Sequence, residues 1–426
     1  MFSTLNKDFW SGLAVFLVAV PLCLGIALAS GAPAIAGLLA WIIGGIVVGF
    51  LSKSPLSVSG PAAWLVAIVV ASISKLWFDG FLIALIIAWL IQVLFGLLKL
   101  SKYAHYVPHS VIKWMLAAIG MTLIIKQGPV LFGVTKRADI LSQYNLIVIC
   151  IGVVALLGMI IREKRGKKHI PAIPGSLIAV MIGLIGYMTY RYGFHNTLQN
   201  SLLIQLPSIS SWADVKNIIH LPTISTIYWL LLNYQLRVTA LTIALVASIE
   251  TILSVKAIDG LDLQKRVTPL DWELISQGIG NTLSWLVGGL PITSVIIRSS
   301  VNLNAGAQSK LSCIIHGILI IIALVLFASI INLIPLTSLA AVLLLTWYNL
   351  TKIEWFIKEY KVGRVEVTSM VITFAVQLAT DLLIGVASGL VFYYFATYLF
   401  VRKNHQSVVT VVDEHNDQDP MEIIED

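Results

Sequence analysis

The chain has 426 residues, of which 58% are hydrophobic and only 12% are charged, and its mean hydropathy is +0.91. A soluble domain has about a quarter of its residues charged, so this composition excludes an ordinary soluble protein and predicts many membrane crossings. The formal net charge of +7 comes from basic residues dispersed among short segments between apolar runs, a pattern that fits membrane topology better than nucleic-acid binding.

The first apolar run, Phe9–Ser30, follows Lys7 and could be mistaken for a secretory signal. It is longer than the apolar region of a signal sequence, and a second apolar run follows at once. We therefore expect it to be the first transmembrane helix. The cysteines, Cys23, Cys150 and Cys313, all lie in apolar segments, which gives neither a disulfide framework nor a metal-binding spacing.

Apolar runs punctuated by Gly, Pro and charged residues predict an all-α polytopic membrane protein with fourteen transmembrane segments. A more polar extracytoplasmic connection, 195–236, separates a first repeat of seven spans (1–194) from a second (237–402), and a short tail (403–426) follows. In chain order, the spans are expected near residues 10–30, 33–51, 61–76, 79–99, 110–127, 143–161, 171–191, 237–257, 270–288, 292–303, 309–330, 334–350, 366–379 and 381–401.

Lysine and arginine gather in the loops that follow even-numbered spans, for example in 162–168 after the sixth span and 256–266 after the eighth. Cytoplasmic loops carry an excess of these residues, so both termini are predicted to lie in the cytoplasm. Lys136 and Arg137, after the fifth span, depart from this pattern.

Two predicted spans, 61–76 and 292–303, are unusually short, and each begins at a Gly/Pro break, Ser59–Pro61 and Gly288–Pro291. Each is the third span of its group of seven, and an odd number of spans per repeat inverts the second repeat in the membrane. Short, Gly/Pro-interrupted spans at matching places of two halves are a sequence indication of a transporter binding site.

A helix that begins in mid-membrane exposes its first backbone N–H groups and about half a positive charge, which favours an anion without a formal cation. Pro61 and Pro291 are suited to such starts, because proline in the first turn loses no helical hydrogen bond. The alternative is a pair of ordinary proline kinks, which membrane helices tolerate. The small residues that would let a ligand approach the backbone are Ala62, Ala63, Thr293 and Ser294.

Ionisable residues inside apolar spans are costly and therefore candidates for function. Glu250 lies well inside the eighth span, and Ser254 follows one turn later on the same helix face. Together they could hold a proton or a sodium ion beside an anion, or Glu250 could form a structural hydrogen bond or an ion pair with Arg298. Arg298 either sets the positive field of the site or neutralises a carboxylate, and His316 is expected to be a packed core histidine.

At these residues the chain resembles the SulP family of anion transporters and exchangers. Val58–Ala62, VSGPA, resembles the signature ahead of that family's third span. Gly289–Leu311, GLPITSVIIRSSVNLNAGAQSKL, resembles its tenth span and the loop that follows. Glu250–Leu253 and Gly278–Asn281 lie where its eighth- and ninth-span motifs fall, and the resemblance covers about residues 8–402.

The resemblance implies seven plus seven inverted spans, with a core domain (spans one to four and eight to eleven) that moves against a gate domain like an elevator. It implies an anion between the starts of spans three and ten and a coupling ion, Na+ or H+, at Glu250 and Ser254, with no other metal or cofactor. The expected partners are a small inorganic anion, membrane lipid and a second copy of the chain. The resemblance carries the anion site over to Ala62, Ala63, Val295 and Ile296, and Pro21 matches the family's first-span proline. With Thr293 and Arg298, these are the expected substrate-binding residues.

The chain also departs from the family pattern. Members usually end in a STAS domain, whereas only the short tail follows the last predicted span, so regulation or dimerisation through STAS is not expected. Leu22 stands where many sulfate-type members have a polar residue, and Ala62 where the family often has Thr. The first span, VPLCLGIALASG, resembles the branch associated with bicarbonate, which favours bicarbonate over sulfate. Family character and the lack of organelle targeting favour a bacterial cytoplasmic membrane.

Several functions remain open at this stage. A cation-coupled anion symporter is favoured, because a pure channel has little need of a buried carboxylate. An uncoupled exchanger or channel could use the same site, and a nucleobase carrier shares the broken helices. An enzyme is not expected, because the sequence has no His/Cys/carboxylate cluster at ligand spacing and no phosphate-binding glycine loop.

Overall fold

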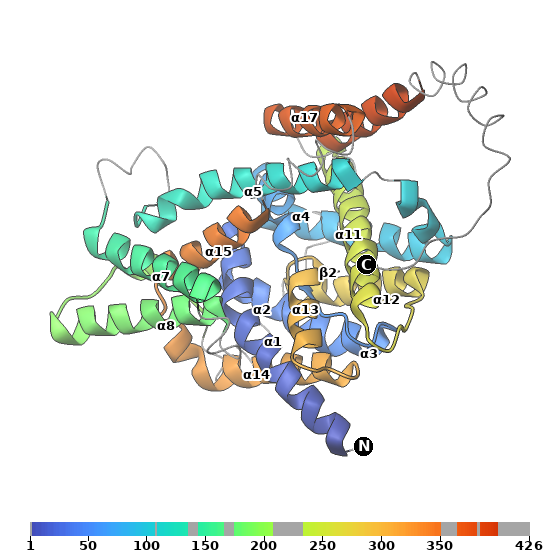
Figure 1. Ribbon diagram of the computed structural model, residues 1–426. Coiled ribbons are helices and arrows are strands. Elements are labelled where there is room, and N and C mark those ends of the chain that lie inside the picture. Colours follow the sequence, from blue (N-terminus) through green and yellow to red (C-terminus); the bar gives the residue numbers. More distant parts are fainter. Residues whose placement is uncertain are drawn as a thin grey trace, which may run out of the picture. The chain divides into compact units, whose positions relative to one another are not determined.

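The computed structural model describes residues 2–106, 109–134, 144–165, 174–207, 233–350, 364–380 and 384–398. Within these ranges the chain is almost entirely helical (Figure 1), so the predicted all-α class is confirmed. The predicted tail and much of the 195–236 connection lie outside the described residues. The helices, labelled as in Figure 1, are α1 (Phe2–Ala29), α2 (Ala34–Ile43), α3 (Gly49–Leu51), α4 (Val66–Leu97), α5 (His109–Leu131), α7 (Leu146–Arg165), α8 (Gly175–Met188), α11 (Tyr234–Leu261), α12 (Leu270–Leu286), α13 (Ile296–Asn304), α14 (Leu311–Ile331), α15 (Leu336–Leu350) and α17 (Arg364–Ala379).

Among the described residues, five helices are long and apolar enough to cross a membrane, and shorter apolar helices accompany them. The long ones follow from uninterrupted apolar runs, since nothing but helix satisfies the backbone within the hydrocarbon region. They are Thr4–Ala29, Ala34–Leu51, Val66–Leu97, Tyr234–Leu261 and Leu311–Ile331, and the shorter ones are Leu146–Arg162, Leu336–Tyr348, Val367–Gln377 and Ile384–Tyr398.

Helix α4 unites the third and fourth predicted spans. Its 32 residues would extend about 48 Å as one straight helix, well beyond a hydrocarbon core of about 30 Å. The backbone breaks at Trp77, where φ is 59° and ψ is 173°. The break falls between the predicted spans 61–76 and 79–99, so α4 consists of two helical segments joined at Trp77.

Two short strands lie directly ahead of the predicted half-helices. β1 (Ser59–Pro61) and β2 (Ile292–Ser294) pair antiparallel, with Gly60 opposite Thr293. The first half-helix therefore begins later than expected, with a 3-10 turn at Ala63–Leu65, and the second begins at Ile296. Strand pairing satisfies the backbone groups of these extended segments in surroundings that offer no water. Pro61 thus lies in a strand, and Pro291 directly before one, rather than in a first helical turn.

The two halves match closely around this strand pair. Gly60 and Thr293 are as far apart in the sequence as Ala63 and Ile296, the first residues of the two half-helices. Helices α1 and α11, which open the two halves, both have 28 residues. Equal separations around an antiparallel pair are expected of two structural repeats related by a two-fold axis.

The chain divides into two compact units, Met1–Tyr106 with Ile119–Thr351, and Val107–Ala118 with Lys352–Asp426. In the first unit, α1, α2 and α14 pack against one another, and α1 and α2 also contact β1. Their apolar contacts include the buried side chains of Leu24, Trp41 and Ile320. In the second unit, Ala117, Met370 and Phe374 pack together. All residues of the candidate site belong to the first unit.

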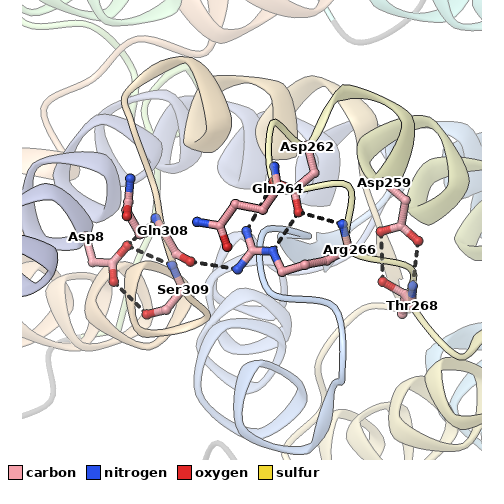
Figure 2. Close-up of polar contacts among 8 residues, drawn as sticks. All are labelled: Asp8, Asp259, Asp262, Gln264, Arg266, Thr268, Gln308 and Ser309. Carbon is pink, nitrogen blue, oxygen red and sulfur yellow. Dashed lines mark hydrogen bonds and ion pairs between the residues drawn. The ribbon is translucent and has the colours of Figure 1, made fainter.

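Polar contacts join helix α1, the loop between α11 and α12, and the loop between α13 and α14 (Figure 2). The buried Asp8 carboxylate accepts hydrogen bonds from the backbone N–H groups of Gln308 and Ser309, at 2.7 and 3.1 Å, and from the Ser309 hydroxyl at 2.6 Å. Arg266 donates to Asp262 at 2.6 Å and to the carbonyl of Gln308 at 2.9 Å. The loop between α13 and α14 is thereby held from both sides.

Candidate functional site

The strand pair brings two helix starts together in the interior of the first unit. The residue that precedes each start, Ala62 and Val295, is buried and makes no side-chain capping hydrogen bond. The first backbone N–H groups of each half-helix therefore depend on other partners. The first helical residues, Ala63 and Ile296, are only partly buried, so these N–H groups could donate to an anion.

Arg298 supplies a positive charge beside these helix starts. Its side chain is 1% exposed, and its guanidinium lies over the ring of Trp41, 3.7 Å from the ring centre. Its Nη2 donates to the carbonyl of Pro61 at 2.8 Å, across the strand pair. Within the described part of the chain, its Nε and Nη1 have no hydrogen-bond partner, which leaves donors for an anionic ligand.

Trp41 is itself held from the other side by His316. The indole N–H of Trp41 donates to Nε2 of His316, and the two rings meet edge to face with their planes 81° apart. Both side chains are fully buried. His316 is therefore a packed histidine, as expected, and it fixes the ring on which the Arg298 guanidinium lies.

Glu250 places a carboxyl group on the neighbouring helix α11, which contacts β2. The carboxylate is buried, and neither oxygen has a hydrogen-bond partner in the described residues. Burial disfavours the charged form of this group, and the Thr293 hydroxyl and the Arg298 guanidinium lie near it. Unpartnered buried oxygens are unusual, and an oxygen-only group of carboxylate and hydroxyl fits a proton or a hard cation such as Na+.

The other predicted residues lie around this group. Ser254 is buried one turn after Glu250 on α11, although no contact described here joins the two side chains. Pro21 is a buried residue inside α1, and its near neighbour Cys23 lies in the same buried apolar cluster as Trp41. Among the described residues, no group of three His, Cys, Asp or Glu side chains could hold a metal ion.

The structure adds residues that the sequence analysis did not single out. Trp41 links Arg298 to His316, and α12 carries a row of buried polar side chains, of which Gln277 and Asn281 contact β1 and β2: Glu273, Gln277, Asn281 and Ser284. Their spacing of four, four and three residues places them on one helix face. Buried polar residues repeated along an otherwise apolar span would have been the sequence signal.

Comparison with known protein families matches residues 5–373 to the sulfate permease family. The chain belongs to this family. The resemblance seen in the sequence motifs is thus confirmed over nearly the whole chain.

Curated relatives are named as transporters. The chain is 28% identical to the putative sulfate transporter YvdB of Bacillus subtilis, over 93% of this chain and 74% of that protein. It is 24% identical to the bicarbonate transporter BicA of Picosynechococcus, over 91% of this chain and 69% of that protein. Such relatives support a transporter and give no support to an enzyme.

Solved structures share the fold. The transmembrane domain of a cyanobacterial bicarbonate transporter, BicA, aligns with a TM-score of 0.72 and 22% identity, over 91% of this chain and 98% of that one. The structure of SLC26A9 aligns with a TM-score of 0.78 and 16% identity, over 94% of this chain and 66% of that one. Both support an all-α polytopic membrane protein.

Proposed function

We propose that this protein is a secondary active transporter of a small inorganic oxyanion, with bicarbonate favoured over sulfate. The observation that carries the proposal is the presence of one buried cation, Arg298, and one buried carboxyl group, Glu250, in the same unit as two uncapped helix starts. Arg298 and the helix starts would bind the anion. Glu250, with Thr293 and Ser254 nearby, would take up the coupling Na+ or H+.

The charge balance of this group favours a monovalent anion. When Glu250 is ionised, its charge cancels that of Arg298, and an added anion leaves the buried group with net negative charge. One bound Na+ or H+ at Glu250 restores one positive charge, which a monovalent anion neutralises. A divalent anion such as sulfate would leave an excess negative charge, which is costly in a medium of low dielectric constant. Anion and cation therefore bind best together, which is the basis of symport.

The proposal extends to the whole transport cycle and its setting. We propose elevator-type alternating access, in which the core formed by spans one to four and eight to eleven, which contains the strand pair, moves against the gate. The protein would reside as a multi-pass protein in a bacterial cytoplasmic membrane, with both termini in the cytoplasm, and would contact lipid and a second copy of itself. The names of the bicarbonate and sulfate relatives support this class of substrate.

The test is uptake of radiolabelled anion into proteoliposomes that contain the purified protein. Bicarbonate and sulfate are compared under an inward Na+ gradient, an inward H+ gradient, or neither. We expect bicarbonate uptake that requires one of the two gradients. Sulfate uptake would overturn the preference for a monovalent anion, and uptake that is indifferent to both gradients would favour an uncoupled exchanger or channel. Inhibition by uracil or xanthine would favour a nucleobase carrier.

Glu250→Gln should abolish gradient-driven uptake, because the neutral amide cannot bind Na+ with a full charge or exchange a proton. Asp259→Asn is the matched control: it makes the same change on the same helix, where Asp259 accepts hydrogen bonds from Thr268. We expect the control to retain gradient dependence. Gradient-driven uptake in Glu250→Gln at the wild-type rate would exclude the coupling role.

A further inference from the structure

Four buried polar side chains lie along one face of α12: Glu273, Gln277, Asn281 and Ser284, here called the α12 ridge. Each of them is at most 1% exposed. Ionic and amide groups with so little exposure are costly unless their hydrogen bonds are made within the protein. The contacts of the ridge are therefore specific, and they converge on the two strands and on the segments that lead into them.

Asn281 holds β2 by its backbone. Its Nδ2 donates to the carbonyl of Ile292 at 2.7 Å, and its Oδ1 accepts from the N–H of the same residue at 2.5 Å. This two-bond contact replaces the partner that a third strand would offer to β2. Two residues before β2, the carbonyl of Leu290 accepts from the Ser284 hydroxyl at 2.9 Å.

Gln277 and Glu273 hold β1 and the segment before it. Nε2 of Gln277 donates to the hydroxyl of Ser59 at 2.6 Å and to the Glu273 carboxylate at 3.1 Å. The same carboxylate accepts from the Ser52 hydroxyl at 2.6 Å. Side chains on one face of α12 therefore form hydrogen bonds with both strands, although the strands belong to different halves of the chain.

We propose that the α12 ridge is the positioning element of the anion site, which fixes β1 and β2 relative to each other so that both helix starts face the anion together. A strand pair of three residues has too few hydrogen bonds to define its own geometry. Without the ridge, β2 and the start of α13 would occupy several positions, and only a fraction of the molecules would present both helix starts. The apparent affinity for the anion falls in proportion to that fraction.

The first readout does not depend on transport. In Asn281→Ala, backbone amides within residues 290–298 should exchange with deuterium about tenfold faster than in the wild type, because local opening becomes easier. Ser276→Ala is the matched control. Ser276 is also buried on α12, but its hydroxyl donates to the carbonyl of Trp272 within the helix, at 2.9 Å. Unchanged protection in Asn281→Ala, or an equal loss in both variants, would overturn the proposal.

The second readout rests on the proposed function. In proteoliposome uptake, Asn281→Ala should raise KM for the anion about tenfold while the maximal rate per folded transporter stays near that of the wild type. Ser276→Ala should change neither. A general loss of stability would instead lower the maximal rate with an unchanged KM, and that result would count against a positioning role. If the wild type carries no anion, the proposed function fails, while the exchange experiment still tests the ridge.

Further variants keep the test open if Asn281→Ala does not fold. Asn281→Asp keeps the acceptor for the N–H of Ile292 and should show smaller changes in exchange and KM. Gln277→Met keeps the size of the side chain but loses its amide. It should speed the deuterium exchange of the backbone amides of Ser59 and Gly60. If Gln277→Met has the same amide exchange rates and the same KM as the wild type, the proposal is contradicted.

Discussion

Gly60 lies in β1 against the guanidinium of Arg298. A Cβ atom at this position would stand 2.7 Å from Nη1 of Arg298 and 3.2 Å from the ring of Trp41. The first distance is shorter than non-bonded contacts allow, so the guanidinium would have to turn away. Its hydrogen bond to the Pro61 carbonyl would then be lost. The absence of a side chain at Gly60 is therefore a condition for the position of Arg298.

Gly60→Ala should raise KM for the anion about tenfold, since a buried charge-assisted hydrogen bond contributes about 1.5–3 kcal/mol and 1.4 kcal/mol is tenfold in affinity. Gly260→Ala is the control, because no atom lies within 4 Å of a Cβ there and alanine is favoured over glycine in a helix. Both are measured by initial rates of uptake over a range of anion concentrations. An unchanged KM in Gly60→Ala would show that anion binding does not depend on the observed position of the Arg298 guanidinium.

Single residues were predictable where their chemistry conflicts with their surroundings. Glu250 and Arg298 could be identified because a charge within an apolar span is costly, whatever the fold. The contact between Trp41 and His316 could not, because it joins residues 275 positions apart in the sequence, and both side chains are compatible with an apolar core. Their importance follows only from the position of Arg298 on the Trp41 ring.

At the scale of elements, the helices were predictable and the strands were not. Apolar runs of about 20 residues can cross a bilayer only as helices. In the described residues the predicted spans coincide with helices, except that 61–76 and 292–303 begin in a strand. β1 and β2 have three residues each, too few to show the alternation of a strand. The Gly/Pro breaks at Ser59–Pro61 and Gly288–Pro291 marked the right places, but not the conformation adopted there.

The loop after α11 has a pH-dependent contact that can be measured. The hydrogen bonds from Arg266 hold the pKa of the Asp262 carboxyl below its usual value. A carboxyl whose folded pKa lies below its unfolded value of about 3.9 contributes stability that is complete above that value. The contribution is lost as the pH falls through the folded pKa.

Asp262→Asn should therefore lower the midpoint of thermal unfolding at pH 7 by about 1–2 °C. The difference from the wild type should be the same at pH 6 and should shrink below about pH 4. Gln264→Ala is the control, because only its backbone N–H contacts Asp262, at 3.0 Å. A difference that grows as the pH falls would contradict this account.

At the scale of the whole molecule, the pattern of basic loops predicts which side of the membrane each loop faces. The turn at Trp77 separates the third from the fourth predicted span and is flanked by the exposed Lys75 and Asp79. It follows an odd-numbered span, so it should face the outside. Lys265 lies after the eighth span, in the basic loop between α11 and α12, and should face the cytoplasm. The fold does not define which side of the membrane these loops face, because it fits the bilayer in either orientation.

Labelling of single cysteines tests this orientation. Lys75→Cys and Lys265→Cys are made separately in a chain that carries Cys150→Ser, because Cys150 is exposed while Cys23 and Cys313 are buried. A membrane-impermeant maleimide should label Lys75→Cys in intact cells and Lys265→Cys only after the membrane is permeabilised. The reverse result would place both termini outside. The whole molecule would then have the opposite orientation in the membrane. The direction of the ion gradient that drives uptake through Glu250 would have to be reconsidered, because alternating access exposes the same residues to opposite compartments.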